Sequence, residues 1–152
     1  MTVKNYLKKF GKIIFYSFSP LIILFILIVK PIIKIRFSFQ SSERIGEIAG
    51  RMEVYLSEKK VSKKHQYLDV FILTDVISNK TYLELLKKKI LILPNFMTYP
   101  IYHVIDVLKN KFPILQSLIL YTKFEDNNFS LMKTGINLTP NNEFIKKGND
   151  FL

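Results

Sequence analysis

An uncharged run of 17 residues near the amino terminus limits what this chain can fold into more than any other feature. The run, IIFYSFSPLIILFILIV at residues 13–29, has lysines on both sides. It is longer than the apolar core that a cleavable signal peptide needs, and Lys30-Pro31 follows where a cleavage site would require small residues. We therefore expect residues 1–30 to form a retained membrane helix with basic flanks.

The sequence leaves open how this helix meets a bilayer. Seventeen helical residues reach about 26 Å, slightly less than the roughly 30 Å of a hydrocarbon core. Pro20 can kink the helix, and basic residues on both sides do not define an orientation. A shallow, re-entrant or interfacial helix would satisfy both flanks. A buried core helix is the remaining alternative.

Positive charge is concentrated around the same run. The first 36 residues carry seven bases and no acid, whereas the other 116 carry 16 bases and 12 acids, for a formal net charge of +11. A nucleic-acid-binding protein would gather basic side chains on its folded surface, beside aromatic or base-reading residues. We therefore expect a membrane as partner and no nucleic acid.

Cysteine is absent and only two histidines occur, His65 and His103. These counts exclude a disulfide framework and thiolate chemistry, and they predict neither a metal site nor a cofactor. Carboxylates at strand ends and in loops are usually solvated or paired, so none is assigned as a general base. The four considered are Glu53, Glu58, Asp69 and Asp75.

The rest of the chain alternates between strand and helix signals. The segment YLDVFIL, residues 67–73, is mostly apolar, as buried strands of parallel sheets are. Other strands are expected at 32–39, 52–56 and 114–121, and helices at 45–50, 79–93 and 99–112, with a loop at 57–66. This order predicts an α/β fold over residues 31–138, a Rossmann-like open, mainly parallel sheet with flanking helices. Thr139-Pro140 then predicts the start of a helix over residues 139–152.

The loop after the first strand is the candidate binding site. A strand, a short polar loop and a helix amino terminus form a common ligand cradle in open α/β sheets, because free N–H groups and the helix dipole point beyond the strand. Ser41 and Ser42 can donate hydroxyls, Arg44 can grip a phosphate or carboxylate, and Gly46 allows close approach. These four residues are the predicted substrate-binding residues, and the catalytic residue stays unknown.

A purely structural interpretation of the same loop is also available. One serine would cap the helix, Arg44 would pair with Glu43 or Glu47, and Gly46 would ease packing against the sheet. Motifs for a P-loop, a dinucleotide fold, a nucleophile elbow or a zinc protease do not occur.

The segment IRFSFQSSERIGEIAGRMEVYL resembles the opening of a group of bacterial glycosyltransferases linked to surface-polysaccharide genes. In that group a strand ending in I-R-F precedes S-R-I-G-H and an E-L-Y-L strand. The likeness extends through YLDVFIL, SNKTYLELLKKKILILP and LTPNNEFIKKGNDFL, and so covers residues 31–152. Glu47 replaces the histidine of the pattern, so no catalytic role is transferred from that histidine. The matching positions are Ile35, Arg36, Phe37, Ser42, Arg44, Ile45, Gly46, Glu53, Tyr55 and Leu56.

The resemblance implies a GT-B-like enzyme, in which two Rossmann-like domains face a cleft. The first domain binds the sugar acceptor and the second binds the nucleotide-sugar donor. We expect this chain to be a truncated first portion, inactive without the donor-binding domain, whose acceptor is a lipid-linked glycan or polysaccharide. Its expected location is the inner membrane of a bacterium, with the soluble part facing the cytoplasm. A non-enzymatic, membrane-anchored binding or accessory protein is the alternative.

Overall fold

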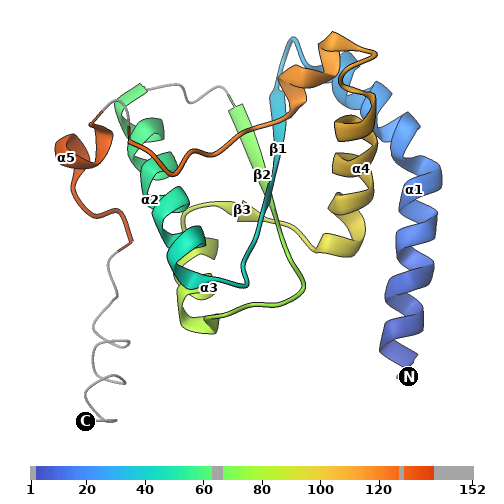
Figure 1. The fold of residues 1–152 in the computed structure, drawn as a ribbon. Helices are drawn as coiled ribbons and strands as arrows, with labels where there is room; N and C mark the ends of the chain where they lie inside the picture. Colours follow the sequence, from blue (N-terminus) through green and yellow to red (C-terminus); the bar gives the residue numbers. More distant parts are fainter. Residues whose placement is uncertain (1–2, 63–66, 127–128, 139–152) are drawn as a thin grey trace.

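A parallel sheet with helices on both faces forms the centre of the protein (Figure 1). Its strands are β1 (Lys34–Gln40), β2 (Tyr67–Leu73) and β3 (Leu91–Ile92), all parallel and in the order β1-β2-β3. The structure is a computed structural model that describes residues 3–62, 67–126 and 129–138. The predicted α/β class and open parallel sheet are therefore confirmed.

An extended segment at residues 119–122, which we call the returning segment, continues the sheet beyond β1. Ile119 forms a parallel bridge with Phe37, and the Leu120 N–H donates to the Phe37 carbonyl at 2.8 Å. The chain thus steps from β1 outward to β3 and then returns to the opposite side of β1. Such a reversal of strand order marks the place where open α/β sheets bind ligands, beyond the carboxyl ends of the strands.

Helices α1 (Val3–Val29) and α4 (Asn95–Leu108) cover one face of the sheet. Figure 1 shows α1 running opposite to β1, with α4 between α1 and the sheet. The predicted amino-terminal helix is confirmed, and α1 is long and apolar enough to cross a membrane. The shared core consists of Ile23, Ile26, Phe37, Val70, Ile72, Ile101, Ile105, Leu115, Leu118 and Ile119.

Helices α2 (Ile45–Ser62) and α3 (Lys80–Lys87) cover the other face. The strand β2 supplies both cores because successive side chains of a strand point to opposite faces. Val70 and Ile72 face α4, whereas Phe71 and Leu73 face α2. The second core consists of Ile48, Met52, Tyr55, Leu56, Phe71, Leu73, Leu86, Ile90 and Leu138.

The predicted strand at residues 52–56 is wrong, because α2 continues through it to Ser62. Gly50 does not end the helix. It makes room for the ring of Phe124, which would lie 2.6 Å from a Cβ at that position. Met52, Tyr55 and Leu56 fall at helical spacing on the buried face, so packing on the sheet overrides the strand propensity of this segment.

The helix expected at 79–93 ends early. Asn79 caps α3 by accepting a hydrogen bond from the Tyr82 N–H at 2.8 Å, but α3 stops at Lys87. The apolar stretch that follows forms a turn and then β3, which pairs with β2 at Val70 and Phe71. Pairing with the open edge of β2 satisfies backbone groups that a longer helix would leave unpaired there.

Three further parts of the chain differ from the prediction. The helix expected at 99–112 is α4, which begins and ends four residues earlier, at Asn95 and Leu108. The segment expected as a strand at 114–121 begins instead as a 3-10 helix, η1 (Pro113–Leu118), whose buried Leu115 and Leu118 have the three-residue spacing of that helix. A short helix not predicted from the sequence, α5 (Ser130–Thr134), lies beside α2. The helix expected at 139–152 and part of the loop expected at 57–66 lie outside the described residues.

Candidate functional site

The loop between β1 and α2 lies at the carboxyl edge of the sheet, where the strand order reverses. It contains the four predicted binding residues. In the structure Ser42 is buried, whereas Ser41 is partly exposed and Arg44 and Gly46 are exposed.

Ser42 is buried and joins the loops that follow β1 and β2. Its hydroxyl donates to the Val76 carbonyl at 2.7 Å and lies 2.7 Å from the Thr74 hydroxyl. Its backbone N–H donates to that same hydroxyl at 3.0 Å, and its carbonyl accepts from the Ser78 N–H at 2.9 Å. Ser42 therefore fixes the position of the loop, while Ser41 beside it is partly exposed.

Arg44 and Gly46 are exposed at the amino terminus of α2. Glu47 pairs with Arg51 at 3.3 Å, and within the described residues no carboxylate lies within 4.0 Å of the Arg44 guanidinium. The surface ion pair of the structural interpretation is thus not formed. A Cβ built on Gly46 would meet nothing within 4 Å, so this glycine is not needed for packing.

A polar network supports the loop from the side of the returning segment. The Gln40 amide donates to the hydroxyls of Ser38 and Thr122, both at 2.7 Å. Arg51 donates to the Thr122 carbonyl at 3.1 Å. These bonds hold the end of β1, the returning segment and α2 together.

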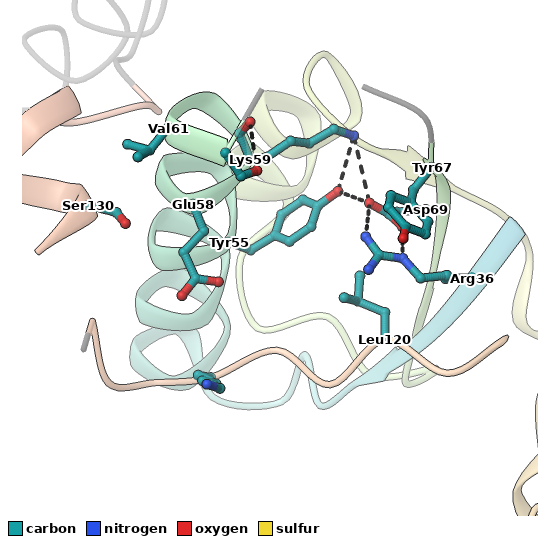
Figure 2. Close-up of a pocket in the computed structure, with 11 residues that line it drawn as sticks. Arg36, Tyr55, Glu58, Lys59, Val61, Tyr67, Asp69, Leu120 and Ser130 are labelled. Carbon is teal, nitrogen blue, oxygen red and sulfur yellow. Dashed lines mark hydrogen bonds and ion pairs between the residues drawn. The ribbon is translucent and has the colours of Figure 1, made fainter. Parts of the chain in front are cut away.

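A second polar cluster lies at the opposite, amino edge of the sheet and lines a cavity of about 380 Å³ (Figure 2). Arg36 and Asp69 are direct neighbours in the register of β1 and β2. Arg36 donates from Nε and Nη2 to the Asp69 carboxylate at 2.7 and 3.0 Å. The guanidinium also lies 4.0 Å from the centre of the Tyr67 ring.

Tyr55 and Lys59 complete this cluster from α2. The Tyr55 hydroxyl donates to Asp69 Oδ2 at 2.6 Å, and Lys59 donates to the Tyr55 hydroxyl at 3.2 Å. Burial raises the pKa of Tyr55 well above its ordinary value, and the hydrogen bond and negative charge of Asp69 raise it further, against the opposing effect of Arg36.

The groups of this amino-edge cluster largely satisfy one another. The Asp69 side chain is only 2% exposed and accepts three hydrogen bonds. The carboxylate is neutralised by Arg36, with Lys59 at 3.8 Å. This arrangement ties β1, β2 and α2 together and engages both oxygens of the carboxylate in hydrogen bonds.

The other carboxylates considered in the sequence have separate roles. Glu53 accepts from the backbone N–H groups of Asn137 and Leu138, both at 2.8 Å, so it fixes the chain after α5. Asp75 is exposed in the loop after β2. Among the described residues, no three metal-ligating side chains gather into a metal site. The expectation of paired or solvated carboxylates is confirmed for Asp69, Glu53 and Asp75.

The Arg36–Asp69 pair was not predicted from the sequence. The signal was present in β2, where Asp69 is the one charged residue of a mostly apolar strand, and Arg36 occupies the same third position of β1. Isolated charges in buried strands are nearly always paired. Recognising the pair required only the parallel alignment of the two strands.

Comparison of the chain with protein-family models, with curated proteins and with solved structures gives no significant match. The geometry of the two sheet edges and the sequence resemblance are therefore the basis for a functional proposal.

Proposed function

We propose that this chain is the acceptor-binding domain of a membrane-associated, GT-B-like glycosyltransferase. The enzyme would transfer a sugar from a nucleotide-sugar donor to a lipid-linked glycan or polysaccharide acceptor at the cytoplasmic face of a bacterial inner membrane. The proposal rests on the S-R-I-G resemblance and on the open loop that carries it.

One observation supports this proposal most directly. Arg44 presents a guanidinium to solvent at the point of strand reversal, and no described carboxylate neutralises it. An arginine fork at a helix amino terminus suits a phosphate or carboxylate, because both the fork and the first-turn N–H groups donate hydrogen bonds. Lipid-linked glycans carry such a phosphate.

The proposed division of labour follows the geometry of the loop. Arg44 binds the phosphate of the acceptor. Gly46 has no side chain, so the phosphate can approach the first turn of α2 closely. Ser41 contributes a hydroxyl at the rim, while Ser42 positions the loop through its bonds to Thr74 and Val76.

In the reaction, an acceptor hydroxyl attacks the anomeric carbon of the donor sugar. The bond from that carbon to the nucleoside diphosphate breaks, the diphosphate leaves with the bonding electrons, and a base takes the hydroxyl proton. By the resemblance, the donor diphosphate would be bound by a second domain. The described residues supply the acceptor side only, and the base is not assigned to any of them.

Binding of a lipid-linked acceptor tests the proposal. The full chain is titrated with nanodiscs of zwitterionic lipid that contain a polyprenyl diphosphate carrying one sugar, and with the same nanodiscs lacking it. A charge-assisted hydrogen bond contributes about 1.5–3 kcal/mol, so Arg44→Ala should weaken acceptor binding about 10- to 100-fold. Its melting temperature should stay close to that of the parent chain.

Lys60→Ala is the matched control, because Lys60 is an exposed base at the opposite end of α2. It should leave acceptor binding unchanged. Equal binding by the parent chain and Arg44→Ala, or equal losses in Arg44→Ala and Lys60→Ala, would reject a specific role for this loop.

A further inference from the structure

The outward face of α1 carries a continuous apolar surface, which we call the outer stripe. Six exposed side chains spaced three or four residues apart lie on this face: Phe10, Ile14, Phe18, Leu21, Phe25 and Ile28. This spacing places them on one side of a helix. A soluble protein rarely exposes so long a row of large apolar side chains without a partner.

The opposite face of α1 is fixed to the domain along most of its length. Near the start, a Cβ on Gly11 would lie 3.3 Å from the ring of Phe96. In the middle, the rings of Tyr16 and His103 lie 5.8 Å apart, and toward the end Ile26 is buried in the core shared with α4. The contacts therefore extend along α4, and Figure 1 shows the two helices side by side.

This packing is incompatible with α1 crossing a bilayer while it stays docked. An upright α1 would carry α4 and the adjoining sheet into the hydrocarbon. That region includes the ion pair of Asp106 and Lys109 and the Arg36–Asp69 pair. Ionised groups are costly at that depth, and the exposed backbone of loops cannot be satisfied there.

The charges around α1 match an anionic surface. Residues 1–42 carry no acid. Lys9 and Lys12, with Asp75 as the one acid, line a cavity of about 360 Å³ on the side of α4. Lys30, at the other end of α1, donates to the Ser117 hydroxyl at 2.7 Å. The bases thus lie behind and beside the outer stripe, where lipid headgroups would surround a helix embedded by its apolar face.

We infer that α1 is a monotopic membrane anchor. It lies in the plane of a bilayer that contains anionic lipid, with the outer stripe in the acyl region and the docked domain above it. This inference concerns the attachment of the chain and stands whether or not the Arg44 loop binds a glycosyl acceptor.

Tryptophan depth measurements distinguish this orientation from a crossing helix. The chain has no tryptophan, so Ile14→Trp, Leu21→Trp and Ile28→Trp each give a single fluorophore on the exposed side of α1. Each full-length variant is bound to vesicles of equal parts phosphatidylcholine and phosphatidylglycerol, with lipids brominated at two depths as quenchers. An in-plane helix gives three similar, shallow depths. A crossing helix places Leu21→Trp about 10 Å deeper than the other two, at 1.5 Å per residue.

Vesicle partitioning provides the second measurement. Leu21→Ser should lower the partition coefficient several-fold, whereas Met132→Ser, at an exposed apolar residue on α5 away from α1, should not change it. Lys9→Gln should lower it about fivefold at low salt, with Lys60→Gln as the control. Circular dichroism checks that each variant is folded.

A deepest position at Leu21 would overturn the inference in favour of a crossing helix. A second outcome would also overturn the inference: the chain does not bind vesicles, forms a dimer in solution, and shields the tryptophans in that dimer. The outer stripe would then be covered by a second copy of the chain. Equal partitioning into neutral and anionic vesicles would reject the role given to the lysines.

Discussion

Arg36 and Arg44 lie at opposite edges of the same sheet and have opposite environments. Arg36 grips the Asp69 carboxylate with two nitrogens and stacks on Tyr67. Arg44 projects into solvent, and Glu47, its nearest acidic neighbour on α2, pairs with Arg51 instead. The same type of side chain thus stabilises the fold at one edge, as Arg36, and stays available for a ligand at the other, as Arg44.

The difference shows which polar groups identify a candidate site in this protein. A cavity of about 380 Å³ and the denser charge cluster are at the amino edge, yet the groups there satisfy one another. The loop at the carboxyl edge has an uncompensated charge, Arg44, and an open glycine, Gly46. Availability of hydrogen-bonding groups therefore separates the two edges better than cavity size does.

Removing Asp69 should produce the largest effect on stability. Asp69→Ala leaves Arg36 and Lys59 close together without their carboxylate, and Tyr55 without its acceptor. Breaking a buried ion pair by removing one partner costs about 3–5 kcal/mol in free energy of unfolding. Urea denaturation followed by circular dichroism measures this loss.

Asp75→Ala is the matched control, since Asp75 is exposed just after the same strand. It should change the free energy of unfolding by less than about 0.5 kcal/mol. If both variants unfolded at the same urea concentration, the amino-edge cluster would not hold the fold together, and the contrast between the two edges would disappear.

Tyr55→Phe should have an intermediate effect. It deletes only the hydroxyl that donates to Asp69 at 2.6 Å. A hydrogen bond to a charged group contributes about 1.5–3 kcal/mol, so the free energy of unfolding at pH 7 should fall by roughly this amount.

The pH dependence of stability checks the same bond. Because the pKa of Tyr55 is raised in the folded protein, the unfolded chain loses its proton first as the pH rises above about 10. Stability should then fall by up to about 1.4 kcal/mol per pH unit for this group. Tyr55→Phe should show a shallower decline between pH 10 and 11.5, and an unchanged slope would contradict the assignment.

Gly46→Ala should have the smallest effect on stability and the opposite sign. The position lies in the first turn of α2, and no atom would meet the added methyl. Alanine is favoured over glycine in a helix by about 0.5–1 kcal/mol, so the melting temperature should rise. Acceptor binding should weaken several-fold, because the methyl occupies the space proposed for the ligand. A variant with higher stability and unchanged affinity would argue against close approach at Gly46.

Local patterns predicted the parts of the fold that they determine. The β1 and β2 strands and the amino-terminal helix all follow from runs of mostly apolar residues with clear boundaries. The continuation of α2 past Gly50 could not be predicted, because the reason for that glycine is the ring of Phe124, which is 74 residues away in the sequence. The shortening of α3 depends likewise on the unpaired edge of β2.

The candidate site was predictable in outline only. Sequence placed Ser41, Ser42, Arg44 and Gly46 in one loop, and the structure places that loop at the edge where the strand order reverses. The sequence could not show that Ser42 forms hydrogen bonds with the loop after β2, since Thr74 and Val76 are over 30 residues away in the chain. Binding by the loop stays a prediction.

The opposite directions of α1 and β1 have a consequence for how substrates would arrive. With α1 embedded lengthwise, the strands also run along the membrane. Helix α4 and the sheet lie between α1 and α2, so Arg44 is on the side of the domain away from the bilayer. The proposed lipid-linked acceptor would keep its lipid tail in the leaflet and extend its phosphate and glycan along the carboxyl edge to Arg44. A water-soluble donor would approach from the bulk, so the two substrates would not compete for one entrance.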